Sequence, residues 1–107
     1  MTMTSKDYKI AKGLKDRLSE IVQLIDFRVF GSRARGDSDE YSDLDVFIEL
    51  ECMDNLLKKK IREIVWEVGL ENEIYISPLI FTRDEVENSP LRVSPIIENI
   101  NAEGVKL

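Results

Sequence analysis

Apolar residues recur at helical spacing in two long stretches of the chain. Between Ser5 and about Leu24 they return every three or four positions with charged residues between them, which predicts an amphipathic helix. Its apolar stripe consists of Ile10, Leu14, Leu18 and Ile21. A second such helix is predicted from a cap at Asp54 or Asn55 to Val68, with Gly69 as its stop. Its buried side is expected to carry Leu57, Ile61, Ile64, Val65 and Val68.

Shorter apolar runs predict strands. Residues 26–30 form one run, and residues 44–50 form a continuous apolar run typical of a strand at the centre of a covered sheet. Residues 74–81 form a third, in which Pro78 favours an edge position or a bulge because proline has no N–H to donate.

The C-terminal part carries two helix-start signals. The sequence Thr82-Arg83-Asp84-Glu85 has the form of a capping box, so a short helix is expected there, ending near Ser89-Pro90. A last helix is predicted from Ser94-Pro95 to Gly104, carrying Ile96, Ile97 and Ile100. The order of elements predicts an α/β (α+β) fold with a small mixed sheet of three or four strands and helices packed mainly on one face. A chain of 107 residues is expected to form one domain, residues 1–107.

The stretch from residue 31 to residue 45, GSRARGDSDEYSDLD, holds the candidate chemistry. Strand side chains alternate between faces, so Asp43 and Asp45 would project to the same side. Their Cα atoms would be about 6–7 Å apart, close enough for both carboxylates to reach one small cation. Two neighbouring carboxylates repel each other, and a bound metal ion is the simplest way to offset that repulsion.

The spacing of Gly31-Ser32, ten residues, and Asp43-Leu44-Asp45 resembles the signature of the minimal nucleotidyltransferases (MNT), a branch of the polymerase-β-like nucleotidyltransferase superfamily. The resemblance implies a polymerase-β-like nucleotidyltransferase fold, with one or two Mg²⁺ ions at Asp43 and Asp45. It also implies transfer of a nucleoside monophosphate, AMP from ATP or the equivalent group of another nucleoside triphosphate, to a hydroxyl. Many members are antitoxins paired with an all-helical HEPN toxin, and some modify a tyrosine of that toxin.

Nucleotide-binding residues are expected beside the aspartates. Backbone N–H groups at Gly31 and the Ser32 hydroxyl could hold phosphate oxygens. Arg33 and Arg35 are candidates for charge compensation on the triphosphate, although Arg35 could equally pair with Asp37 or Asp39.

The third carboxylate has several candidates. Fully active members of the family carry an acid on a neighbouring strand, and the corresponding position here is Tyr75. Glu73 lies on the same predicted face and is our candidate for the catalytic acid, while Glu71 and Glu49 are weaker candidates and a solvated strand end is an equal alternative for Glu73. Loss of a general base typically costs about 10²–10⁴ in rate. A catalytically weak or inactive nucleotide-binding antitoxin, which neutralises its partner by forming a complex, therefore remains the alternative function.

Composition limits other functions. The net charge of −6 argues against direct binding of nucleic acid, and the lack of histidine removes most zinc and acid–base arrangements. Cys52 has no partner for an internal disulfide, and neither a signal peptide nor a run of about 20 apolar residues is evident, so we expect a soluble, cytoplasmic protein. A DxD glycosyltransferase would need a longer nucleotide-binding domain. We expect Trp66 in the core or at its edge and Lys58–Lys60 on a solvated helix face.

Overall fold

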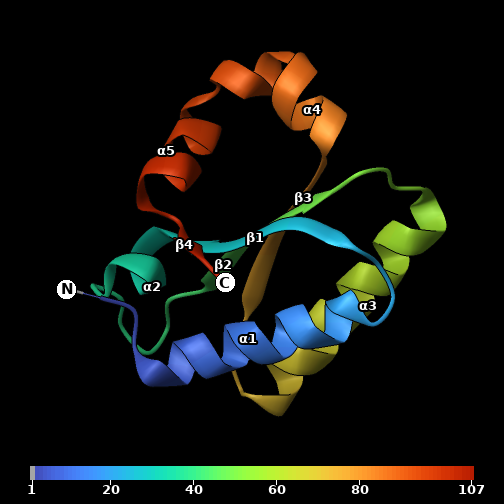
Figure 1. Cartoon of the computed structure of the whole chain (residues 1–107). Coiled ribbons are helices and arrows are strands. Elements are labelled where there is room, and N and C mark those ends of the chain that lie inside the picture. The colour runs from blue at the N-terminus through green and yellow to red at the C-terminus, as the bar shows by residue number, and fades with distance from the viewer. Residues whose placement is uncertain (1) are drawn as a thin grey trace.

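A four-stranded sheet lies between two unequal layers of helices (Figure 1). The structure is a computed structural model, and it describes residues 2–107. The elements in chain order are α1 (Ser5–Ser19), β1 (Leu24–Phe30), α2 (Gly31–Arg35), β2 (Leu44–Leu50), α3 (Asn55–Glu71), β3 (Ile76–Thr82), α4 (Arg83–Asn88), the 3₁₀ turn η1 (Pro90–Val93), α5 (Pro95–Glu103) and β4 (Val105–Lys106). The predicted α/β class with a small mixed sheet is confirmed.

The strands lie in the order β3-β2-β1-β4. β1 pairs antiparallel with β2 and with the short β4, whereas β2 and β3 are parallel. Helix α3 provides the crossover that a parallel pair requires. β3 is an edge strand, as Pro78 indicated, and β2 lies in the interior of the sheet, as its apolar run indicated.

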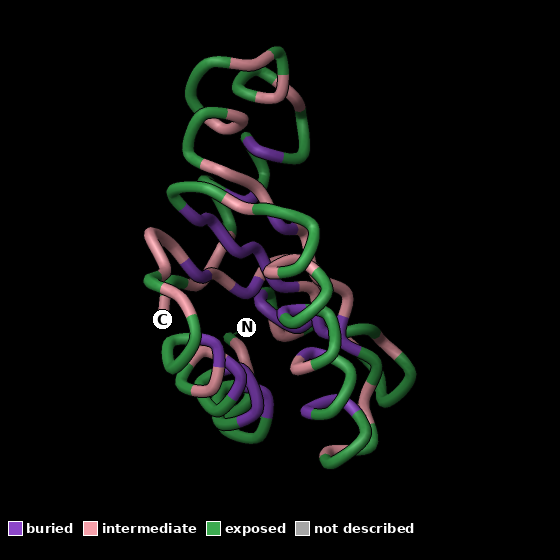
Figure 2. Tube along the Cα trace, turned by 90° about the vertical axis from the view of Figure 1, so that its right-hand side faces the viewer, coloured by how far each residue is buried: buried purple, intermediate pink, exposed green. Residues whose placement is uncertain are grey.

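The larger core lies between the sheet and the two long helices. Leu44, Val46 and Ile48 of β2 are fully buried on this side. They pack against α1 and α3, whose buried residues are Ile10, Ala11, Leu14, Leu18, Ile61, Val65 and Val68. Figure 2 shows these buried stretches facing the sheet, with the exposed turns of both helices outside. The amphipathic stripes read from the sequence therefore form the main core.

A smaller core lies on the opposite face of the sheet. Phe47 of β2 contacts Ile97 and Ile100 of α5, and its ring centroid lies 6.0 Å from that of Phe81. The two long helices cover one face, as expected, and α4, η1 and α5 form a second cover that arches over the other (Figures 1 and 2).

Some boundaries differ from the prediction. α1 ends at Ser19 because β1 begins at Leu24, and Ile21 is accordingly exposed. α3 continues through Gly69 to Glu71, so the predicted stop at Gly69 is wrong. A Cβ at Gly69 would lie 2.7 Å from the carbonyl oxygen of Ile74, and the glycine therefore serves close packing rather than helix termination.

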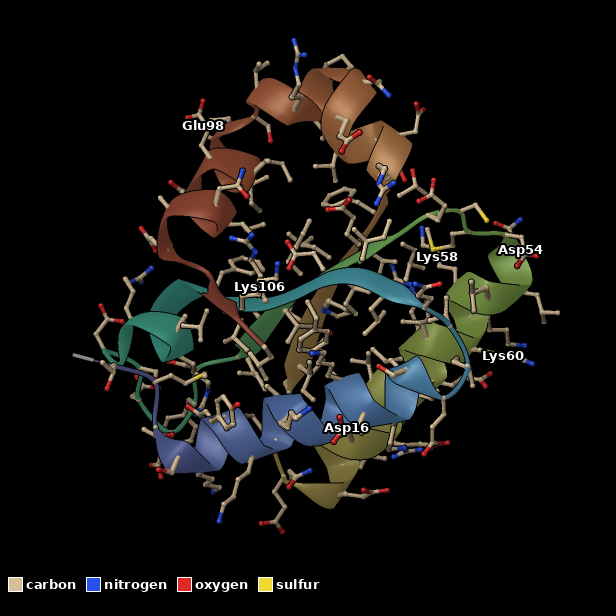
Figure 3. All side chains as sticks on the ribbon, viewed as in Figure 1. Asp16, Asp54, Lys58, Lys60, Glu98 and Lys106 are labelled. Carbon is tan, nitrogen blue, oxygen red and sulfur yellow. The ribbon has the colours of Figure 1, made fainter. Side chains whose placement is uncertain are left out.

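Polar side chains occupy the N-terminal end and the outer face of α3. Asp54 caps the helix by accepting a hydrogen bond from the Leu57 N–H, and Lys60 points away from the sheet (Figure 3). Lys59 and Lys60 are exposed, in agreement with a solvated face. Trp66 is also exposed, at 59%, so its predicted core placement is wrong.

The two C-terminal helices begin as predicted. Thr82 and Glu85 form a complete capping box at α4, and Ser94 caps α5. No helix in residues 2–107 is long and apolar enough to cross a membrane.

Candidate active site

The end of β1 and the start of β2 meet at one end of the sheet. The antiparallel register pairs Phe30 with Asp45, and α2 begins at Gly31, immediately after Phe30. Asp43 stands just before the first residue of β2. The structure therefore brings the Gly31-Ser32 turn and both aspartates together.

The Asp45 carboxylate lies against the backbone of Gly31. Gly31 has φ +73°, a conformation that other residues rarely adopt, and a Cβ at this position would lie 2.5 Å from Asp45 Oδ2. A side chain at residue 31 would therefore collide with the carboxylate. Glycine at this turn leaves room for Asp45 and for whatever Asp45 binds.

The two carboxylates influence each other. Asp45 is partly buried and Asp43 is exposed. Burial, and secondarily the negative charge of Asp43, raise the pKa of Asp45. A cation would offset this repulsion, because it favours the charged form of both groups.

The donor set suits a hard cation. Carboxylate oxygens are ligands that Mg²⁺ prefers, and Mg²⁺ commonly keeps several waters, so two aspartates suffice as protein ligands. The space that glycine leaves beside Asp45 Oδ2 fits the same interpretation. Within residues 2–107, no group of three or more Asp, Glu, Cys or His side chains is placed to hold a metal ion. Asp43 and Asp45 are therefore not joined by a third acidic ligand.

Arg33 has structural partners. Its Nη1 lies 3.0 and 3.2 Å from the two carboxylate oxygens of Asp7, and its Nε donates to the Ser42 carbonyl at 2.8 Å. The Arg33–Asp7 ion pair is buried on both sides. These contacts tie α1 to α2 and to the loop before Asp43, which gives Arg33 a structural role different from the expected contact with phosphate.

Arg35 is exposed at the end of α2. Its Nη1 lies 3.0 Å from Glu103 Oε2, and its Nε lies 3.2 Å from Asp37 Oδ2. Hydrogen bonds to Glu103 and then to Asp37 raise the pKa of Arg35. Asp37 was one of the two partners considered from the sequence, whereas Glu103, 68 positions away, carried no local signal.

The candidates for a third acid lie apart from the aspartate pair. Glu73 is exposed in the turn between α3 and β3, with φ 55°. It lines a cavity of about 340 Å³ on the α3 side, together with Trp66, Leu70 and Tyr75. Glu71 forms an ion pair with Arg17.

The strand register shows which residue does lie beside Asp45. Ser77 of β3 is paired with Asp45, and Glu49 is paired with Asp26 further along the sheet. Sequence reasoning missed Ser77 because it assumed an acid or its replacement at residue 75. Strand alternation places Ser77 on the face opposite to Ile76, but the register that sets Ser77 beside Asp45 comes from the packing of β3 against β2.

A glycine-serine turn after the first strand, followed by two aspartates at the start of the next strand of a mixed sheet, is the arrangement typical of the nucleotidyltransferases. The chain belongs to the nucleotidyltransferase domain family, whose model matches residues 9–104. It is thus a nucleotidyltransferase by family.

One relative is similar over most of both chains. It is named "Putative protein adenylyltransferase MJ0141", from Methanocaldococcus jannaschii, and is 40% identical over 98 residues, covering 82% of this chain and 93% of the relative.

Solved structures share the fold at lower identity. A "putative nucleotidyltransferase" from Sulfolobus solfataricus matches with a TM-score of 0.58 and 18% identity over 99% of this chain and 89% of that one. A mutant of the MntA-HpeT toxin–antitoxin matches with a TM-score of 0.56 and 19% identity over 94% of this chain and 70% of that one. At these identities the likeness concerns the fold.

Proposed function

We propose that this chain, as one nucleotidyltransferase domain spanning residues 1–107, transfers AMP from Mg-ATP to a hydroxyl of a partner protein. The observation that supports this best is the Asp45 carboxylate lying against Gly31, with Asp43 beside it. This arrangement puts a pair of cation-binding oxygens next to a turn whose backbone can approach a ligand closely.

In this proposal Asp43 and Asp45 hold Mg²⁺, which neutralises charge on the triphosphate and orients it for displacement. The Gly31 backbone and the Ser32 hydroxyl bind phosphate oxygens. Arg35 is exposed and close to the turn, so it can approach the triphosphate by exchanging its contacts with Asp37 and Glu103. Arg33 keeps Asp7 and the loop in place.

The proposed acceptor is a tyrosine of an all-helical HEPN-type toxin, and the chain is its antitoxin. The protein adenylyltransferase name of the M. jannaschii relative supports the reaction. The fold shared with MntA-HpeT agrees with a toxin partner. We expect the pair to act in the cytoplasm, where ATP and Mg²⁺ are available.

A non-catalytic antitoxin is the second candidate. It is favoured by one observation: no third acid joins Asp43 and Asp45 among the described residues. Glu73, exposed in the turn between α3 and β3, stays our candidate for the general base. In the second candidate the chain binds nucleotide but neutralises the toxin by complex formation.

Labelled ATP distinguishes the two candidates. The chain is incubated with ATP labelled at the α-phosphate, Mg²⁺ and the toxin, alongside the Asp43→Asn and Asp45→Asn variants. Catalysis predicts label on the toxin with the wild type and at least 100-fold less with either variant. An Asn variant that still neutralises the toxin in cells, together with an unlabelled toxin, would instead establish the masking antitoxin.

A Glu73→Gln variant tests the third acid. If Glu73 is the general base, the rate falls by about 10²–10⁴ while ATP affinity is unchanged. An unchanged rate assigns Glu73 to the solvated turn in which the structure places it.

A further inference from the structure

Ser77 lies beside Asp45 on the same face of the sheet. β2 and β3 are parallel, and their register pairs Asp45 with Ser77. Adjacent strands lie about 4.8 Å apart, and paired residues project to the same side. The Ser77 side chain therefore emerges next to the Asp45 carboxylate.

The burial pattern of β3 supports this orientation. Ile76 and Ile80 belong to the large core under α1 and α3, whereas Leu79 and Phe81 pack in the smaller core under α5. Ser77 precedes Leu79 by two positions and shares its face. At the site end of that face, one row across the sheet reads Phe30, Asp45 and Ser77.

The Asp45–Ser77 pair is polar, whereas the β2–β3 pair that follows it on this face is apolar. The next β2–β3 pair along this face is Phe47 with Leu79. Within the described residues, neither the Ser77 hydroxyl nor the Asp45 carboxylate takes part in a hydrogen bond with another protein group. A serine at this position places an oxygen beside Asp45 that the packing of the small core does not require.

We infer that Ser77 is the third oxygen-bearing residue of the cation site, a positioning residue whose hydroxyl faces the ion held by Asp43 and Asp45. The inference rests on the proposed function, because it assumes that the two aspartates bind a divalent cation. If this inference is right, an aspartate introduced at residue 77 would add a third carboxylate ligand to the ion. A cysteine introduced there would place its thiolate within reach of the same ion.

The test measures Mn²⁺ binding rather than activity. Titrations by calorimetry and by electron paramagnetic resonance compare the wild type with Ser77→Asp and Asp45→Asn. We expect Ser77→Asp to bind Mn²⁺ at least ten-fold more tightly, since it adds a carboxylate to the site. Its melting temperature should fall below that of the wild type in EDTA and recover when Mn²⁺ is added.

Ser94→Asp is the matched control. It makes the same chemical change at the cap of α5, where aspartate caps as well as serine and no cation site is proposed. Its Mn²⁺ affinity should equal that of the wild type. Equal affinities for Ser77→Asp and Ser94→Asp would overturn the inference.

A second variant covers the case in which Ser77→Asp does not fold. Ser77→Cys changes the size of the side chain little and should bind Cd²⁺ through the new thiolate, detected by cadmium–thiolate absorption beyond that of wild-type Cys52. No added absorption would count against the inference.

The outcomes separate the two levels of the proposal. Wild-type Mn²⁺ binding that Asp45→Asn abolishes and Ser77→Asp leaves unchanged refutes the role of Ser77 alone. Binding that appears only in Ser77→Asp and depends on Asp45 supports the position of Ser77 but contradicts the proposed function. No binding in any variant refutes both.

Discussion

Replacing Gly31 with alanine tests the contact on which the site depends. The residue has φ +73°, and the added Cβ would lie 2.5 Å from Asp45 Oδ2. Either the turn changes its conformation or the carboxylate moves. Both outcomes separate Asp45 from its present place beside the turn.

The expected magnitude follows from these two numbers. A left-handed conformation costs a residue with a Cβ about 1–2 kcal/mol. To reach the 3.4 Å of ordinary van der Waals contact, the carboxylate must retreat by about 0.9 Å. Gly31→Ala should therefore lose about 1–2 kcal/mol of stability through the backbone conformation, plus the cost of displacing the carboxylate. Since a displacement of about 1 Å at a reacting centre can cost 10²-fold in rate, transfer should fall about 100-fold.

Urea denaturation gives the stability change, and label transfer from ATP gives the rate. The matched control is Gly13→Ala, because Gly13 lies in the middle of α1 with nothing within 4 Å of an added Cβ. The same substitution should there stabilise the protein by about 1 kcal/mol, since alanine is the better helix former. The rate should stay unchanged.

A double variant separates the two causes. In an Asp45→Ala background the clash is absent, so Gly31→Ala should cost only the conformational part of its destabilisation. Equal costs in both backgrounds would show that the contact between Gly31 and Asp45 carries no energy. Wild-type transfer by Gly31→Ala would refute the assignment of this turn to the active site.

Three further predictions concern residues away from the turn. Arg33→Ala should destabilise the protein by about 3–5 kcal/mol, measured by urea denaturation, because it leaves buried Asp7 unpaired. Unchanged stability together with weaker ATP binding would instead show that Arg33 binds the triphosphate. Burial, and then the charge of Asp26, raise the pKa of Glu49, so the folded state binds this proton more tightly than the unfolded chain and stability is lost as pH rises through the folded pKa. Glu49→Gln should therefore be more stable than the wild type at pH 7 and lose that advantage near pH 4, and parallel melting curves across this range would contradict the sign. Thr82→Ala should cost about 1 kcal/mol through loss of the capping box, measured by thermal melting, and an unchanged melting temperature would show that α4 contributes nothing to cooperative unfolding.

Several features of the fold could be predicted from short stretches of sequence. The caps at Asp54, Thr82 and Ser94 each accept a hydrogen bond from a backbone N–H three residues later. Both partners of such a bond lie within one helical turn, so a short stretch of sequence is enough to predict it. The strand at residues 44–50 was predicted with its observed bounds because its apolar run is continuous. The meeting of the Gly31-Ser32 turn with Asp43 and Asp45 follows from the same kind of pattern, since a single antiparallel pair of strands brings them together.

Other features depend on contacts between distant segments. The predicted stop at Gly69 was wrong because glycine is needed there for close contact with the Ile74 backbone across the following turn, and not to end the helix.

The sequence by itself determined the helices, the main strands, the interior position of β2 and the pair of aspartates beside a glycine-serine turn, because period, caps and spacing are local properties. Only the tertiary structure decided that Arg33 binds Asp7, that Arg35 reaches Glu103 and that Ser77 stands next to Asp45. Ion pairs between distant segments and the register of parallel strands are fixed by the packing of the whole domain, and a change of register by one residue would move every strand side chain to the other face.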